Sequence, residues 1–135
     1  MTLRIPSFLL ALSLMLAAAS TRAAEAPDDL LQYIDLKPSF VLNVQSPGGK
    51  MRFAKVDASV KVLTRSAAAL VEQHMPYIRN IMVMLLTATP ADQLRSVEGR
   101  EAVRKEALKR VQAFFKKEEN RPVVDDLLFT SFVVQ

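Results

Sequence analysis

The stretch from Thr89 to Lys117 constrains the fold most, because it carries a long run of helical periodicity. Thr89, Pro90 and Asp92 are the residue types of a helix start, with Thr89 as the expected cap. Beyond Gly99, apolar side chains recur every three or four residues along one stripe: Val103, Ala107, Leu108, Val111, Phe114 and Phe115. The pattern predicts a long amphipathic helix with one face packed on a core.

A second helix start lies inside this stretch at Ser96, so Gly99 marks a bend or a restart between two helices. The face opposite the apolar stripe is charged. Acid-before-base pairs four residues apart favour helix, and this face has two of them: Glu101 with Lys105, and Glu106 with Arg110. These residues predict a docking helix and give no indication of a catalytic role.

A period-two pattern from Arg52 to Leu63 predicts a strand with one buried and one wet face. The buried face takes Ala54, Val56, Ala58, Val60 and Val62, and the wet face takes Phe53, Lys55, Asp57, Ser59 and Lys61. A short strand at Phe40–Val44 precedes it, and the turn residues Ser-Pro-Gly-Gly at 46–49 lie between the two. The three segments together predict a hairpin.

Two shorter helices and a last strand complete the expected order. The helices are Arg65–Gln73 and Tyr77–Leu86, the second opened by Pro76 and apolar nearly all round. The strand is Leu127–Gln135, which implies pairing within the fold. The order predicts an α+β fold, with helices packed on one face of a small antiparallel-leaning sheet.

The N-terminal segment has the pattern of a signal peptide or a short membrane anchor. Residues 5–21 carry no charge, and their apolar centre, Phe8–Ala19, is shorter than the ~20 residues that usually span a bilayer. Small residues predict cleavage before Ala24 or, less favourably, before Pro27. We therefore expect residues 1–24 to be this segment, residues 25–38 a polar linker and residues 39–135 the folded domain.

Charge and composition exclude some classes of protein. The net charge is +4, but Arg4 and Arg22 flank the N-terminal apolar run, and the remainder carries +2 with the two signs interspersed. That profile is not typical of a nucleic-acid binder. The chain has no cysteine, so a disulfide framework and a thiolate metal site are excluded.

The residues offer little for catalysis, and we predict no catalytic, cofactor-binding or metal-binding residue. His74 is the only histidine, and a lone histidine at a helix junction is more often a cap or surface residue than a ligand. Glycine occurs only three times, which leaves no phosphate loop or nucleophile elbow. The methionines at 51, 75, 82 and 84 favour gap-filling in a core over a metal site.

Several short segments follow one another in a distinctive order: FVLNV at 40–44, PYIRNI at 76–81, LL at 85–86, EGR at 98–100, RKE at 104–106 and FTSFVVQ at 129–135. In this order, from about residue 33 to residue 135, the chain resembles the FliL family of flagellar basal body-associated proteins. The final F-T-x-F-V-x-Q is the most specific part of the resemblance.

The resemblance implies a non-enzymatic periplasmic domain, similar in fold to the stomatin-type (SPFH) domain and tethered to the inner membrane, with no cofactor. Such domains are expected to form homo-oligomers, as rings around the stator proteins MotA and MotB, and to support motility. The candidate contacts with subunits or partners are Arg79, Arg100, Lys105 and Lys109; for Arg79 a surface salt bridge is the alternative.

Members of the family usually carry a clear membrane anchor after a short cytoplasmic segment, whereas here the apolar run starts almost at Met1. Cleavage would give a soluble or peripherally held protein. A different class of function is a secreted binding module, in which the methionine-rich helix forms one wall of an apolar pocket. A hydrolase would need a perturbed titrating group near His74.

Overall fold

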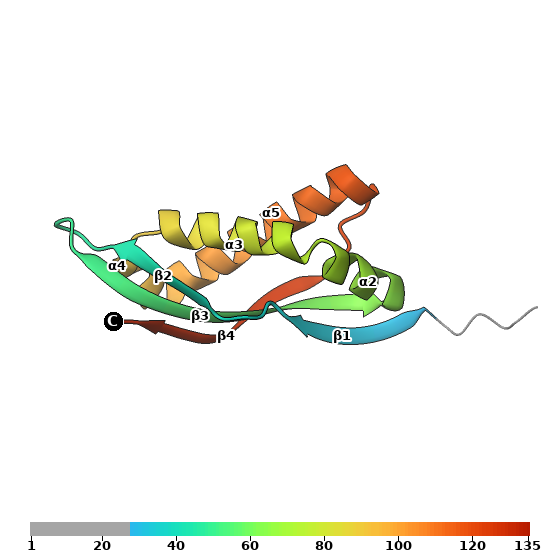
Figure 1. Cartoon of the computed structure of the whole chain (residues 1–135), viewed down its shortest axis with the longest axis horizontal. Helices are drawn as coiled ribbons and strands as arrows, with labels where there is room; N and C mark the ends of the chain where they lie inside the picture. Colours follow the sequence, from blue (N-terminus) through green and yellow to red (C-terminus); the bar gives the residue numbers. More distant parts are fainter. Residues whose placement is uncertain (1–27) are drawn as a thin grey trace, which may run out of the picture.

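The computed structural model describes residues 28–135, which form a sheet with a layer of helices on one of its faces (Figure 1). The elements are β1 (Asp29–Asp35), β2 (Phe40–Gln45), β3 (Met51–Thr64), α2 (Arg65–Gln73), α3 (Met75–Ala88), α4 (Ala91–Arg95), α5 (Val97–Glu119) and β4 (Asp126–Val134). The α+β class and the one-sided helix layer are confirmed. The predicted signal or anchor segment at 1–24 lies outside the described residues.

The long strand β3 is the axis of the sheet, and all its pairings are antiparallel. β2 pairs with the first half of β3 and β1 with the second half, while β4 spans the middle. Val60 pairs with both Ile34 in β1 and Leu127 in β4, so β1 and β4 lie on opposite edges of β3. β1 and β2 therefore follow one another along one edge, and β4 runs along the other.

The core lies between β3 and the helices. The buried face predicted for β3 is confirmed, because Ala54, Val56, Ala58, Val60 and Val62 are all buried. Ser59, predicted on the wet face, is buried as well, where its hydroxyl donates to Asp35. The apolar stripe of α5 is also confirmed: Val103, Ala107, Val111 and Phe115 are buried, and Leu108 and Phe114 pack against them. Burying a valine or phenylalanine side chain contributes about 1.5–3 kcal/mol, so the two patterns together hold the layers in contact.

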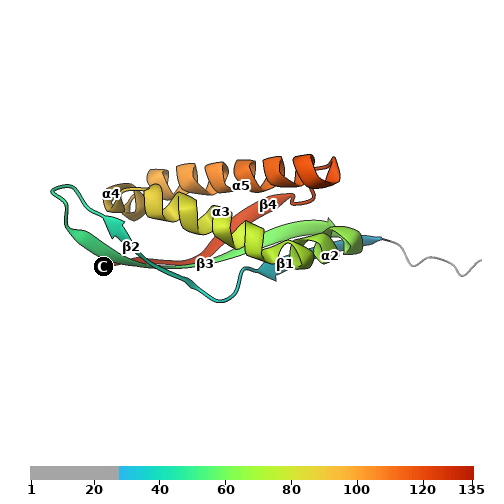
Figure 2. The ribbon, with the colours of Figure 1, turned by 45° about the horizontal axis from the view of Figure 1, so that its top comes forward.

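The helix layer consists mainly of α3 and α5, which lie side by side above the sheet (Figure 2). Their ends meet where Tyr77 stacks on Phe114, with ring centroids 5.4 Å apart. His74 closes the same end, since its Nε2 lies 3.2 Å from Oε1 of Glu119. Among the helices of residues 28–135, none combines the length and the apolar content that crossing a bilayer requires.

The range expected to be a polar linker, residues 25–38, is not a linker over Asp29–Asp35, because these residues form strand β1. Its alternation is hard to see in the sequence, since only Ile34 is buried while Leu31 and Tyr33 are exposed. The register also shifts between Asp29 and Gln32, which interrupts a clean period of two.

The predicted restart inside the long helical stretch is confirmed. α4 ends at Arg95, α5 begins at Val97, and the Oγ of Ser96 between them accepts a hydrogen bond from the amide of Gly99 at 2.9 Å. The cap predicted at Thr89 was wrong. Its hydroxyl donates to the carbonyl of Leu85 at 2.8 Å, so it finishes α3 instead of opening α4.

Candidate interaction surfaces

Arg79 ties the loop between β1 and β2 to helix α3. Its Nη1 donates to the carbonyl oxygens of Leu36 and Pro38 at 2.6 and 2.7 Å, and its guanidinium carbon lies 4.3 Å from the centre of the Phe40 ring. These carbonyls belong to a break in the strand edge, where no neighbouring strand satisfies them. Within residues 28–135 Arg79 makes no salt bridge, which was the alternative considered for it; its guanidinium joins the β1–β2 loop to the helix layer.

Arg100 sits in the first turn of α5, beside α4 and the end of β4. Its Nη1 donates to the carbonyl oxygen of Arg95 at 3.1 Å, and its guanidinium carbon lies 5.8 Å from the ring centre of Phe132. Both contacts orient the side chain without neutralising its charge. Within residues 28–135 no carboxylate forms an ion pair with Arg100.

Lys105 and Lys109 are exposed on the outer face of α5. Lys105 is 70% exposed, and its Nζ is 3.9 Å from a carboxylate oxygen of Glu101. An ion pair with this long a separation and this much solvent exposure contributes little to stability. The four candidate residues therefore separate: Arg79 serves the fold, Arg100 borders β4, and the two lysines form part of an open charged face.

Sequence reasoning missed Arg104, which is the centre of the charged network on α5. It bonds both carboxylate oxygens of Glu101 at 2.7 Å, Asp126 at 2.7 Å and the carbonyl of Leu127 at 3.2 Å. The hydrogen bond from Arg104 lowers the pKa of Glu101, and the Arg104 charge adds to the effect. The Glu101–Arg104 spacing of three residues was visible in the sequence, but the link to β4 was not.

The other predicted helix pair is confirmed. Arg110 donates to Glu106 at 2.7 Å, and this bond lowers the pKa of the Glu106 carboxyl. The outer face of α5 is therefore a band of charges, most of which already have a partner on the same helix.

The outer face of α3 is different, because it has no charged side chain. The helix buries Ile78, Met82, Leu85 and Leu86, which leaves a stripe of exposed residues that we call the α3 stripe: Tyr77, Asn80, Val83, Met84 and Thr87. Tyr77 and Met84 are each 62% exposed. An exposed apolar helix face of this kind is a feature of surfaces that contact other molecules.

The methionines of α3 do not share one wall of a pocket, as a binding module built on them would require. Met82 is fully buried and Met75 packs against the core, as gap-filling methionines do, whereas Met84 is exposed. Met51 at the start of β3 is also exposed. The core interpretation thus holds for two of the four.

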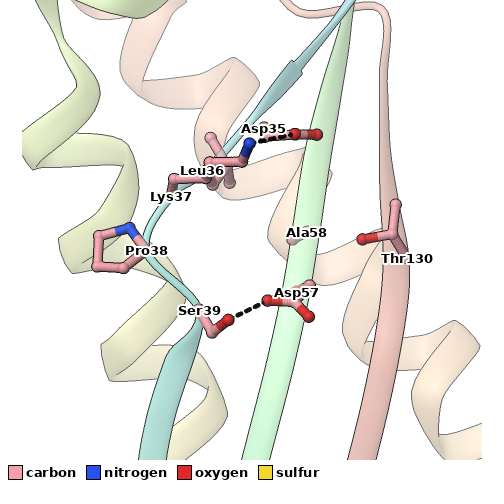
Figure 3. Close-up of a pocket in the computed structure, with 8 residues that line it drawn as sticks. All are labelled: Asp35, Leu36, Lys37, Pro38, Ser39, Asp57, Ala58 and Thr130. Carbon is pink, nitrogen blue, oxygen red and sulfur yellow. Dashed lines mark hydrogen bonds and ion pairs between the residues drawn. The ribbon is translucent and has the colours of Figure 1, made fainter.

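A groove of about 690 Å³ opens where the β1–β2 edge is interrupted. Figure 3 shows two carboxylates in its lining, each already held by a neighbour: Lys37 contacts Asp35 at 3.3 Å, and the Ser39 hydroxyl donates to Asp57. Ser59 also donates to Asp35 at 2.7 Å, and this bond, with the one from Lys37, lowers the Asp35 pKa. The groove therefore marks the gap between β1 and β2, and both of its carboxylates are already bonded within the domain.

His74 lies at the junction of α2 and α3, as predicted, but its ring is not a surface group. The side chain is 16% exposed and packs edge-on against Phe114 and Phe115 while it contacts Glu119. Within residues 28–135, no group of three or more His, Asp or Glu side chains gathers as metal ligands would.

The domain is a two-layer α+β domain, and its outer helix faces carry one uncharged and one charged surface. Comparison with known proteins gives the family. The family model "Flagellar basal body-associated protein FliL" matches residues 33–135, so the chain belongs to the FliL family. It is also 26% identical over 110 residues to a flagellar protein FliL of Aquifex aeolicus (strain VF5). The match covers 82% of this chain and 65% of the length of that relative.

Proposed function

We propose that this protein is a non-enzymatic flagellar basal body component that assembles with copies of itself and supports the stator proteins MotA and MotB in motility. The observation that carries the proposal is the contrast between the uncharged α3 stripe and the charged outer face of α5. The two helices are neighbours in one layer, so both surfaces are available on the same side of the molecule.

The energetics favour contact through the α3 stripe. Covering an exposed apolar side chain contributes about 25 cal/mol per Å² removed from water. Tyr77 and Met84 are anchors of the kind that dominate such interfaces, because they are large and well exposed. The lysines of α5, Lys105 and Lys109, would then steer and align a partner more than bind it, as charges at the rim of an interface do.

The place of assembly is also part of the proposal. A domain of this family is expected at the inner membrane, facing the periplasm, in a ring of stomatin-type domains. N-terminal sequencing and fractionation of the protein expressed in a Gram-negative host decide between two forms. Retention of Met1 with the inner membrane supports the anchored ring; a chain that begins near Ala24 in the soluble periplasmic fraction contradicts it.

The direct test is Met84→Asp, with Leu31→Asp as its matched control. The two side chains have the same exposure, 62%, but Leu31 lies in β1 and not in the helix layer. We expect Met84→Asp to weaken self-association by about tenfold or more, as for an interface anchor, and to reduce swimming in a strain that lacks the native gene. Leu31→Asp should leave both unchanged.

The measurement is analytical ultracentrifugation of the full chain, with circular dichroism to confirm folding. A double variant, Lys105→Glu with Lys109→Glu, tests the charged face separately. Equal self-association of wild type and both helix variants would exclude the helix layer as the interface.

A further inference from the structure

A second surface, away from the α3 stripe, lies along the outer edge of β4. Residues Leu127 to Val134 form an edge strand without a single charged side chain. Proteins usually protect such an edge with charges, prolines or coverage, because its backbone groups otherwise pair with another chain. β4 is paired with β3 on one side.

The hydrogen bonds to β3 show which backbone groups of β4 turn outward. Gln135 exchanges both backbone bonds with Phe53, at 2.9 and 3.1 Å, so its groups point inward. In an antiparallel ladder the direction alternates from residue to residue. Val133 therefore also points inward, and Phe132 and Val134 direct their N–H and C=O groups away from the sheet.

The other end of the same edge is closed. The Leu127 amide donates to Oδ1 of Asp126 at 2.8 Å, and the Leu127 carbonyl accepts from Arg104 at 3.2 Å. Between the two ends the register shifts opposite Asp57 and Ala58, which leaves Thr130 as the extra residue of a bulge. The open part of the edge is thus short and begins after the bulge.

A groove of about 430 Å³ accompanies this open part, and its lining combines one strand edge with one helix junction: Leu94, Arg95, Arg100, Phe132, Val133 and Val134. α4 and the C-terminal end of β4 lie at the same end of the molecule in both views (Figures 1 and 2). Phe132 and Val134 supply apolar surface, while Leu94 is fully buried beneath the groove. The charge comes from two guanidinium groups, and none of the ion pairs within residues 28–135 involves either.

From this arrangement we infer that the groove binds an extended, acidic segment of a partner protein, which adds as a strand to the outer edge of β4 at Phe132–Val134. Main-chain hydrogen bonds to the free edge provide affinity in this mode of binding, and side-chain pockets provide specificity. Arginine pairs with carboxylate through short, charge-assisted bonds. Arg95 and Arg100 therefore select an acidic side chain on the incoming strand.

The probe is a fluorescein-labelled heptapeptide of alternating valine and glutamate, measured by fluorescence anisotropy against the full chain. We expect saturable binding, and binding weaker by about tenfold or more when lysine replaces glutamate in the peptide. Hydrogen exchange at the amides of Phe132 and Val134 should slow on binding, because those two N–H groups acquire acceptors.

Two variants separate the charge from the backbone contribution. Arg95→Glu with Arg100→Glu should reduce affinity about tenfold or more, while the same reversal at Lys116 and Lys117, at the far end of α5, should not. Val134→Pro removes one outward N–H without changing charge, at a position where an edge strand tolerates proline. It should also reduce affinity.

Several results would overturn the inference. They are absence of saturable binding, equal binding of the lysine peptide, and full affinity in either groove variant. Protection of the Phe132 and Val134 amides before peptide is added would show that a second copy of the chain occupies the edge. None of these outcomes depends on self-association through the α3 stripe, so the two proposals fail separately.

Discussion

The two edges of the sheet differ in how helix arginines contact their backbone carbonyls. On the β1–β2 side the strand edge is broken at Leu36–Ser39, and Arg79 reaches down from α3 to bond the exposed carbonyls. On the β4 side Arg104 reaches down from α5, but it closes only the end at Leu127. The same device, a helix arginine bonded to strand carbonyls, bridges the break between β1 and β2 on one edge and fixes only the start of β4 on the other.

The largest effect is expected where α4 turns into α5, because this junction forms the wall beside the open edge. A Cβ atom on Gly99 would lie 2.0 Å from the carbonyl oxygen of Gln93, which is backbone and cannot move aside cheaply. Gly99→Val should lower the free energy of unfolding by about 3 kcal/mol or more, measured by urea denaturation.

The control for that variant is Gly48→Ala in the β2–β3 turn. A Cβ there meets nothing within 4 Å, but φ is +87°, so only backbone strain of about 1 kcal/mol is expected. If Gly99→Val were no more destabilising than Gly48→Ala, the close approach of α4 to α5 would not be a constraint.

Removing the contacts of Arg104 with Glu101, Asp126 and Leu127, which we call the Arg104 clamp, should have the next largest effect on stability. Arg104→Gln leaves Asp126 without its cation, Glu101 with only the long contact to Lys105, and the Leu127 carbonyl without its donor, which should cost about 2 kcal/mol. The side chain is 22% exposed, so water compensates part of the loss. Arg104→Lys keeps the charge but not the forked geometry and should fall between the two. Equal stability of all three forms would contradict a clamp.

Removing the Arg79 clamp should cost less, about 1–2 kcal/mol, because both of its bonds go to neutral carbonyls and no carboxylate is left unpaired. Arg79→Met retains the stem that packs near Phe40. Hydrogen exchange should quicken at the β1–β2 edge and stay unchanged at β4, which would show that the two edges are independent. Faster exchange at both edges would instead show that the sheet responds as one unit.

Much of this arrangement was predictable, because it follows from local periodicity. The β3 alternation, the α5 stripe and the restart at Ser96 each depend on residues within one segment. The Pro-Gly-Gly turn likewise predicted the hairpin, since two of its residues are glycines with positive φ.

The parts that sequence could not supply depend on contacts between distant segments. β1 was missed because it buries a single face at the edge of the sheet, where its partner residues in β3 lie 24 to 35 residues away along the chain. Arg79 and Arg100 looked alike as exposed helix cations, and only the β1–β2 break and the β4 edge distinguish them. Only the tertiary structure therefore distinguishes Arg79, which stabilises the fold, from Arg100, which is available to a partner.

The smallest effect, and the finest comparison of the two edges, is their response to acid. The pKa of Asp35 on the β1 side is lowered by Ser59 and Lys37, and that of Glu101 on the β4 side is lowered by Arg104. A carboxyl group whose pKa is lower in the folded state than in the unfolded chain stabilises the fold above its unfolded pKa, and this stabilisation is lost as pH falls through the folded value. The free energy of unfolding should therefore decline between about pH 5 and pH 3.

One substitution at each edge should remove that edge's contribution to the acid-dependent loss of stability. Ser59→Ala takes away the main cause of the Asp35 shift, and Arg104→Gln takes away that of Glu101, so each variant should show a shallower loss of stability with acid than wild type. The effects should be small, because both carboxylates are well solvated, and they should add in the double variant, because the two sites share no partner. A decline that Ser59→Ala leaves intact but Arg104→Gln abolishes would place the acid sensitivity on the β4 edge alone. The contacts of Arg104 would then be the ones that depend on the charge of a carboxylate. Those of Arg79 go to neutral carbonyls and would persist across the whole acid range.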